Sequence, residues 1–191
     1  MPLAVTHVLV PIILFEALRD SSKRMAKHFS PKHTFLVGVA GLMPDMDVPL
    51  FNALNAAGVS MQSAIGHRIF FHNVWIPLGF LLFFALFAYV WPAMMGRRNR
   101  KYRQGRSLAF AKVFLLLAVG WAFHLALDAV LTGEVMPFYP LSDYLINWNL
   151  VGAVADATSI PITTLRASLD AMFLLLWLWH EQFTHRIRDY F

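Results

Sequence analysis

The sequence contains no cysteine and unusually little charge. The lack of cysteine excludes disulfide frameworks, thiolate zinc sites, iron–sulfur clusters and cysteine nucleophiles, so any metal must be held by histidine and carboxylate side chains. Charged residues make up 14% of the 191 positions and hydrophobic residues 58%, whereas a typical soluble domain carries about 25% charge. This composition argues against an ordinary soluble domain and predicts that the chain lies in a membrane.

Long uncharged segments predict an all-α protein, a polytopic membrane helical bundle. A spanning helix needs about 20 mostly apolar residues, and residues 73–95 meet this requirement without a single charge. Residues 113–133 form a second candidate, interrupted only by His124 and Asp128. The other expected membrane segments are two spanning helices at residues 2–18 and 160–183, and a re-entrant or broken segment at residues 34–65.

The broken segment is predicted because glycine and proline divide it into short pieces, and such backbone is tolerated in a membrane only where protein or water satisfies it. In the last span, Arg166 and Asp170 are expected to reach the surface as a snorkelling pair. The chain has no internal repeat, low-complexity tract or linker. We therefore expect a single integral membrane domain, residues 1–191, with about four spanning helices plus the broken segment.

The basic residues are unevenly distributed along a chain whose net charge is +5. Fourteen of the sixteen lysines and arginines lie in residues 19–32, in residues 97–112 and in the tail. Alternating spans place these segments on one membrane face, and the positive-inside rule makes that face cytoplasmic. We expect a bacterial or archaeal cytoplasmic (inner) membrane protein whose residues 45–72 and 132–165 face outward. A short basic hinge between two spans needs no nucleic-acid partner, and none is expected.

Histidine and aspartate side chains are expected to gather at one depth near the outer face. His124 and Asp128 are four positions apart, so they lie on one side of a helix. Singly, such residues have ordinary explanations: a lone histidine such as His7 often forms an interhelical hydrogen bond, and Asp-x-Asp after proline often caps a helix. Together they must be paired, protonated or bound to metal. The predicted metal ligands are His7, Asp45, Asp47, His67, His72, His124 and Asp128.

The predicted ligands indicate which metals could bind, and the remaining histidines of the chain are not expected to bind metal. Imidazole and carboxylate without sulfur suit zinc, manganese or iron, and seven ligands exceed what one tetrahedral ion uses, so we predict two divalent ions, zinc or manganese. No role is expected for His28 and His33, which lie among lysines on the basic face. His180, Glu181 and His185 resemble a zincin motif, but their i, i+5 histidine spacing and cytoplasmic placement argue against a site.

Four short segments occur in a recognisable order, namely THVLV, GLMPDMDVP, GHRIFFHNVW and FHLALDAVLTGEVMPF. Over residues 6–140 they resemble the LexA-regulated, YdjM-like family of membrane-bound metal-dependent hydrolases, whose pattern is T-H, L-P-D-x-D, H-R-G-x-T-H-S and H-x-x-x-D. The resemblance implies a hydrolase site reminiscent of zinc-dependent phospholipase C, built from the predicted ligands and Arg68. Ile69, Phe71 and Asn73 replace the family's glycine, threonine and serine. These changes alter the wall of the site but none of its ligands.

The resulting hypothesis is a membrane-embedded metal-dependent hydrolase that cleaves a phosphoester of a lipid or lipid-linked substrate with metal-activated water. Catalytic roles are predicted for Arg68 on the phosphate, for Asp45 as a metal carboxylate and for Glu134 as a general acid. One alternative is a small proton- or metal-coupled transporter, because intramembrane histidine and aspartate also form proton relays. The other is a structural membrane protein with a metal clamp. The oligomeric state does not follow from the sequence.

Overall fold

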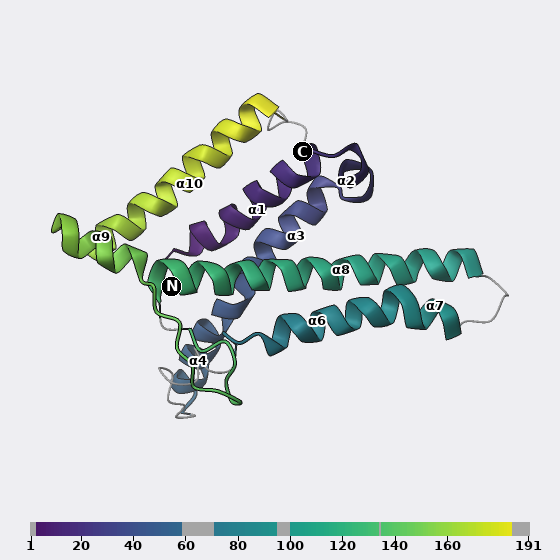
Figure 1. Ribbon diagram of the computed structural model, residues 1–191, viewed down its shortest axis with the longest axis horizontal. Helices are drawn as coiled ribbons and strands as arrows, with labels where there is room; N and C mark the ends of the chain where they lie inside the picture. Colours follow the sequence, from purple (N-terminus) through teal and green to yellow (C-terminus); the bar gives the residue numbers. More distant parts are fainter. Residues whose placement is uncertain (1–2, 59–70, 95–99, 134, 185–191) are drawn as a thin grey trace.

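The computed structural model describes residues 3–58, 71–94, 100–133 and 135–184, and these residues are mainly helical (Figure 1). They contain no β-strand, only an isolated bridge between Val135 and Ile146. The α-helices are α1 (Ala4–Asp20), α2 (Lys23–His28), α3 (Pro31–Leu42), α4 (Asp47–Ala56), α6 (Trp75–Ala85), α7 (Trp91–Met94), α8 (Arg100–Leu127), α9 (Leu150–Thr158) and α10 (Ile162–Thr184). A 3₁₀ turn, η1 (Met43–Met46), links α3 to α4, and two π-helical turns, η2 (Leu86–Val90) and η3 (Asp128–Thr132), follow α6 and α8. The predicted all-α fold is confirmed.

Four helical segments among the described residues are long and apolar enough to cross a membrane. They are Pro31–Ala56, Trp75–Met94, Gln104–Thr132 and Ile162–Thr184. The last three correspond to the spans predicted at residues 73–95, 113–133 and 160–183. The chain is therefore a helical membrane bundle by length and composition.

The first predicted segment is short, and the segment predicted as broken is more continuous than expected. Helix α1 has 17 residues, which is at the short end of the range for a spanning helix, and it is not among the four candidates. The segment predicted as broken at residues 34–65 instead continues through α3, η1 and α4 as one candidate span. Its proline and glycine residues therefore interrupt the α-helical geometry only by a single 3₁₀ turn at Met43–Met46. The predicted part beyond residue 58 lies outside the described residues.

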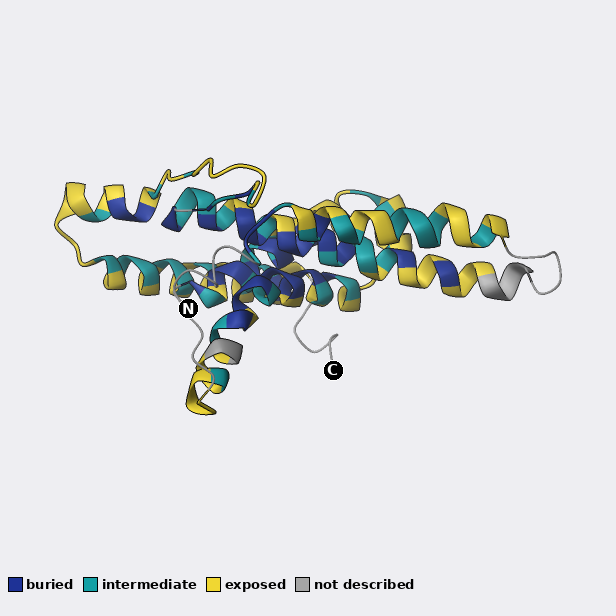
Figure 2. Cartoon of the chain, turned by 90° about the horizontal axis from the view of Figure 1, so that it is seen from below, coloured by how far each residue is buried: buried dark blue, intermediate teal, exposed yellow. Residues whose placement is uncertain are grey.

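The long helices pack side by side in the order α10, α1, α3, α8 and α6 (Figure 1). Figure 2 shows that buried residues concentrate where these helices meet, whereas the outer helices are largely exposed. Phe15, Val37 and Leu116 form a core cluster between α1, α3 and α8. Leu82 on α6 is 70% exposed, as expected for a side chain that faces lipid.

Two glycines let the central helices approach closely. A Cβ atom at Gly41 on α3 would overlap the main-chain carbonyl oxygen of His7 on α1. A Cβ atom at Gly120 on α8 would overlap the carbonyl oxygen of Val37 on α3. Small residues at helix contacts are typical of membrane bundles, where close backbone packing stabilises association.

The two ends of the bundle differ in charge. At one end, which we call the basic end, α2 joins α1 to α3 and carries Lys23, Arg24 and Lys27. Lys112 of α8 contacts this end, because its Nζ donates to the carbonyl oxygen of His28 at 3.0 Å. At the opposite end α1 and α6 begin and α3 and α8 finish (Figure 1).

Candidate metal centre

Five buried side chains converge at the end of the bundle opposite the basic end. Asp45 of η1, His72 before α6, His124 of α8 and Asp128 of η3 each offer one ligand atom, and these four atoms all lie within 4.8 Å of one another. His7 of α1 joins them, because its Nε2 lies 3.2 Å from Oδ1 of Asp128. Each of the five is at most 9% exposed. Four separate segments of the chain thus meet at one point.

The imidazole rings of His72 and His124 direct the same atom toward the two carboxylates. Their Nε2 atoms lie 3.0 Å apart and lie 3.2 and 3.4 Å, respectively, from Oδ2 of Asp128. The corresponding distances to Oδ1 of Asp45 are 3.5 and 3.7 Å. All four donor atoms therefore face a common centre instead of forming separate pairs.

Main-chain carbonyl groups set the tautomer of two of these histidines. Nδ1 of His124 lies 2.7 Å from the carbonyl oxygen of Gly41, and Nδ1 of His7 lies 2.8 Å from that of Leu3. Because a carbonyl oxygen only accepts hydrogen bonds, each Nδ1 carries the proton and donates it. In the neutral ring the lone pair is then on Nε2, directed into the cluster. A main-chain carbonyl group is a usual hydrogen-bond partner for the ring nitrogen of a metal-binding histidine that does not contact the metal.

The cluster needs positive charge. Nitrogen lone pairs and carboxylates that face one another repel unless a proton or a cation lies between them. Burial opposes the charged form of His72, which precedes the α6 span, but hydrogen bonds and charges from Asp128 and Asp45 outweigh burial and raise its pKa to about 9. Metal ions and protons compete for such ligands. A buried donor set of nitrogen and oxygen atoms fits a divalent metal ion such as zinc or manganese.

Local sequence explains how the two aspartates are placed. Pro44 lies at the first turn of η1, so α3 changes to 3₁₀ geometry there and Asp45 follows in the buried part of the turn. At the end of α8 the N–H of Gly133 donates to the carbonyl oxygen of Asp128 at 2.7 Å, which closes a π turn. π turns inside α-helices are rare and frequent at functional sites. Thr132 also donates from Oγ1 to Oδ1 of Asp128 at 3.2 Å.

Neighbouring hydrogen bonds hold the segment that carries His72. The indole Nε1 of Trp121 donates to the carbonyl oxygen of Phe71 at 2.9 Å, and the N–H of Val74 donates to that of Pro137 at 2.8 Å. Phe71 packs its ring beside Trp121. The segment is thus tied to α8 on one side and to the loop after η3 on the other.

Asp170 of α10 contacts the first turn of α1, which carries His7, and its sequence context did not predict this contact. Its Oδ1 accepts hydrogen bonds from the N–H of Thr6 at 2.8 Å and from the Thr6 hydroxyl at 2.6 Å. The expected snorkelling role of Asp170 is therefore wrong, because the carboxylate is half-buried against the first turn of α1. No local signal could have found this contact, since 164 positions separate the two residues.

Among the described residues, one predicted ligand besides His7 is not in the group of four ligand atoms. Asp47 is 2% exposed at the first position of α4, but it is absent from the group of four ligand atoms. His67, Arg68 and Glu134 lie outside the described residues. Their roles as ligand, phosphate-binding residue and general acid stay predictions.

A second group of ligand-type side chains lies toward the basic end, where the sequence analysis rejected a zincin motif. Glu16 of α1 and His180 and Glu181 of α10 offer ligand atoms within 4.8 Å of one another. His180 Nδ1 lies 3.8 Å from Glu16 Oε2 and 3.6 Å from Glu181 Oε1. His185, the other histidine of the motif, lies outside the described residues. Arg19, one turn along α1 from Glu16, is also buried and brings a fixed cation to this region.

The fold and the buried cluster define a class, namely a helical membrane protein whose histidine and aspartate side chains could hold a metal ion. The family model described as YdjM inner membrane protein matches residues 1–187, and the chain belongs to this family. The resemblance drawn from its motifs is thereby confirmed, and the match extends to the basic tail. No curated protein and no solved structure matches the chain.

Proposed function

We propose that this protein is a metal-dependent hydrolase that cleaves a phosphoester of a lipid or lipid-linked compound. The observation that supports it best is the convergence of the His72 and His124 Nε2 atoms on the carboxylates of Asp45 and Asp128. Hydrolytic metal centres use such nitrogen and oxygen donors. A divalent ion bound there would activate a water molecule and polarise a phosphoryl oxygen.

The position of Asp128 supports the expectation of two ions. Its Oδ1 lies beside His7 Nε2 at 3.2 Å, whereas its Oδ2 faces His72 and His124. A carboxylate whose oxygens face different nitrogen donors is suited to bridge two neighbouring metals. In this arrangement His72, His124 and Asp45 would hold one ion and His7 would help to hold the other, with the Asp128 carboxylate available to both.

A phosphoester of a lipid is the substrate class that the position of the centre supports. The centre lies where α6 begins and α8 finishes, and since both belong to candidate spans, we propose that it lies near the lipid headgroups. Arg68 is the proposed phosphate-binding cation, because a guanidinium pairs bidentately with phosphate. Glu134 is the proposed general acid. The charge of the basic end supports a cytoplasmic orientation for that end, which turns the centre to the outer side.

Metal analysis of the detergent-purified protein tests the centre. We expect about two equivalents of zinc or manganese per chain, as in two-metal sites, and loss of metal in His72→Ala. The matched control is His28→Ala, which removes an exposed histidine at the basic end and leaves the metal content unchanged. Wild-type protein that stays metal-free after incubation with zinc and manganese would overturn the proposal.

A phosphoester screen separates the enzyme from its alternatives. The metal-loaded protein is tested on bis-p-nitrophenyl phosphate and on phosphatidic acid and phosphatidylglycerol in mixed micelles. We expect hydrolysis that disappears in Arg68→Ala while the metal is retained. Metal binding without hydrolysis would favour a structural clamp, because the ligands come from several helices. Metal or proton flux in proteoliposomes would favour a transporter.

A further inference from the structure

The loop of residues 135–149, which follows η3, exposes large apolar side chains. Leu141 is 78% exposed, Trp148 72% and Tyr144 62%. Phe138 and Leu145 are exposed as well. Exposed apolar groups gathered on one short segment indicate a contact surface for another molecule.

Hydrogen bonds hold this loop in a defined shape. Val135 and Ile146 exchange both main-chain hydrogen bonds, at 3.1 and 2.9 Å, and Val135 is buried. The indole Nε1 of Trp75 donates to the carbonyl oxygen of Tyr139 at 2.9 Å. The exposed side chains therefore project from a braced loop, and their exposure is a property of the fold.

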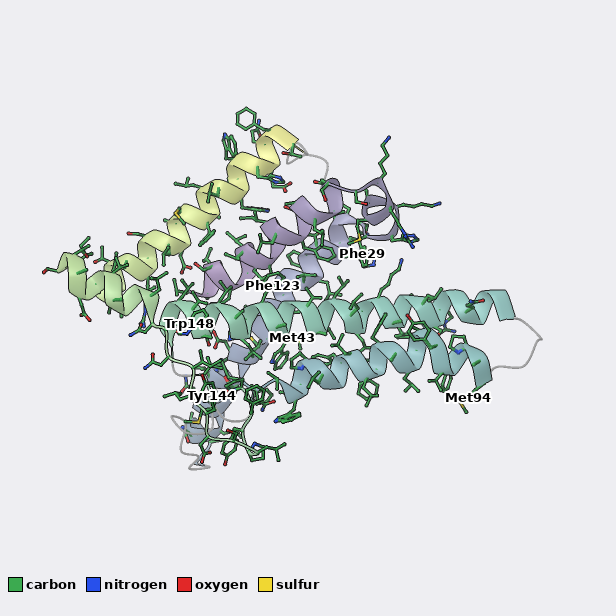
Figure 3. All side chains as sticks on the ribbon, in the orientation of Figure 1. Phe29, Met43, Met94, Phe123, Tyr144 and Trp148 are labelled. Carbon is green, nitrogen blue, oxygen red and sulfur yellow. The ribbon has the colours of Figure 1, made fainter. Side chains whose placement is uncertain are left out.

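The loop lies beside the ends of two candidate membrane spans. The N–H of Val74, just before the α6 span, donates to the carbonyl oxygen of Pro137 at 2.8 Å. At its other end the N–H of Trp148 approaches the carbonyl oxygen of Ala129, in the last turn of the α8 span, at 3.4 Å. Figure 1 shows the loop beside the end of α8, and Figure 3 labels Tyr144 and Trp148 on it. Tryptophan and tyrosine are enriched at this depth in membrane proteins.

The charge of the region distinguishes between possible partners. The chain has no lysine or arginine from residue 113 to residue 165, and Asp143 is the only charged residue within the loop. An anionic lipid surface or a nucleic acid would require basic residues here. A neutral boundary between headgroups and acyl chains requires only apolar and amphipathic side chains. The membrane that holds the spans already provides this boundary.

We infer that the 135–149 loop inserts Leu141, Tyr144 and Trp148 into the headgroup–acyl boundary of the membrane. The loop thereby forms a lipid-contacting surface beside the candidate metal centre. The loop is bonded to the residues that follow His72 and Asp128, so a lipid held against it lies next to the centre. The inference that the loop presents lipid to the centre rests on the proposed hydrolase function. The inference that the loop contacts lipid is independent of that function.

The absence of native cysteine allows single labels to test the contact. Bimane is attached to Leu141→Cys in phosphatidylcholine nanodiscs that contain doxyl lipids. Leu82→Cys on α6 is the hydrocarbon control and the exposed Lys27→Cys on α2 is the aqueous control. We expect the label at position 141 to be quenched most by doxyl groups near the headgroup, at a depth between those of the two controls.

Three outcomes would overturn the lipid contact. One is quenching at position 141 by an aqueous quencher to the same extent as at position 27. Another is lipid quenching that appears only when phosphatidylglycerol is added, because it would show that anionic charge is required. The third is protection of the label from both kinds of quencher, together with disulfide-linked dimers of the unlabelled Leu141→Cys protein, which would identify a second copy of the chain as the partner.

Presentation of lipid to the centre has its own measurement. In Leu141→Ser/Tyr144→Ser we expect unchanged metal content and a raised KM for bilayer-embedded phosphatidic acid, with a smaller change for the water-soluble bis-p-nitrophenyl phosphate. Equal changes for both substrates would overturn this step. If neither substrate is hydrolysed by the wild type, the proposed function fails, while the bimane result still decides whether the loop contacts lipid.

Discussion

The Nε2 atoms of His72 and His124 lie 3.0 Å apart although 52 positions separate the two residues. His72 precedes α6, and His124 lies one turn before the end of α8, which packs beside α6 in the opposite direction. The pairing of these two spans therefore brings the two rings together. Buried among carboxylates, the rings are stabilised in this arrangement only by a cation or a shared proton.

Metal should stabilise the folded protein through the buried cluster. At a free zinc concentration of 100 times Kd, linkage predicts a gain of about 2.7 kcal/mol in the free energy of unfolding. Thermal unfolding in detergent, followed by tryptophan fluorescence, measures the gain as a rise in Tm. We expect the rise to vanish in Asp45→Ala and to persist in Asp143→Ala, which removes an exposed carboxylate. An equal rise in both variants would place the zinc elsewhere.

Substitution of Gly41 should disturb both packing and the metal centre. The new Cβ atom of Gly41→Ala would overlap the carbonyl oxygen of His7, so α1 must move away from α3, at a cost of about 1–3 kcal/mol. Because His7 moves with α1, metal affinity should fall too. Gly79→Ala on α6 is the matched control, since no atom lies within 4 Å of its new Cβ. In this control we expect stability to stay unchanged or to rise by about 0.5–1 kcal/mol. Similar losses in both variants would argue against the close contact.

Asp170 should position His7 through the first turn of α1. Asp170→Ala removes the acceptor of both Thr6 hydrogen bonds, so the first turn of α1, which carries His7, loses this contact with α10 and we expect the metal affinity to fall. Isothermal titration with zinc measures the change. Thr6→Ser, which keeps the hydroxyl, should retain most of the affinity, and Asp156→Ala, an exposed carboxylate on α9, should retain all of it. Unchanged zinc affinity in Asp170→Ala would show that the contact is only structural.

The orientation in the membrane can be read from two single cysteines. Asp143→Cys and Lys27→Cys lie at opposite ends of the bundle, and both native side chains are exposed. By the positive-inside rule, a membrane-impermeant maleimide added to intact spheroplasts should label position 143 and not position 27. Lysed spheroplasts should show labelling at both positions. Labelling of position 27 alone in intact spheroplasts would reverse the orientation and place the metal centre on the cytoplasmic side.

The local properties of the sequence were sufficient for the fold class and for three of the spans. Hydropathy over about 20 residues is a local quantity, and in a bilayer it nearly determines where helices form. The i, i+4 spacing of His124 and Asp128 likewise placed them on one face of a helix, where the structure has them. Helix α1, whose 17 residues pack between α3 and α10, is not among the four candidate spans.

Tertiary structure alone decided which polar residues share the centre. Asp45 and Asp47 are two positions apart and both are buried, yet only Asp45 belongs to the group of four converging ligand atoms. The bond between Asp170 and Thr6 depends on how α10 crosses α1. Helix crossings arise from contacts between distant segments, which no window of sequence contains. The sequence thus determined that this chain is a helical membrane protein with histidine and aspartate at one depth, and the packing of its helices decided which of them meet.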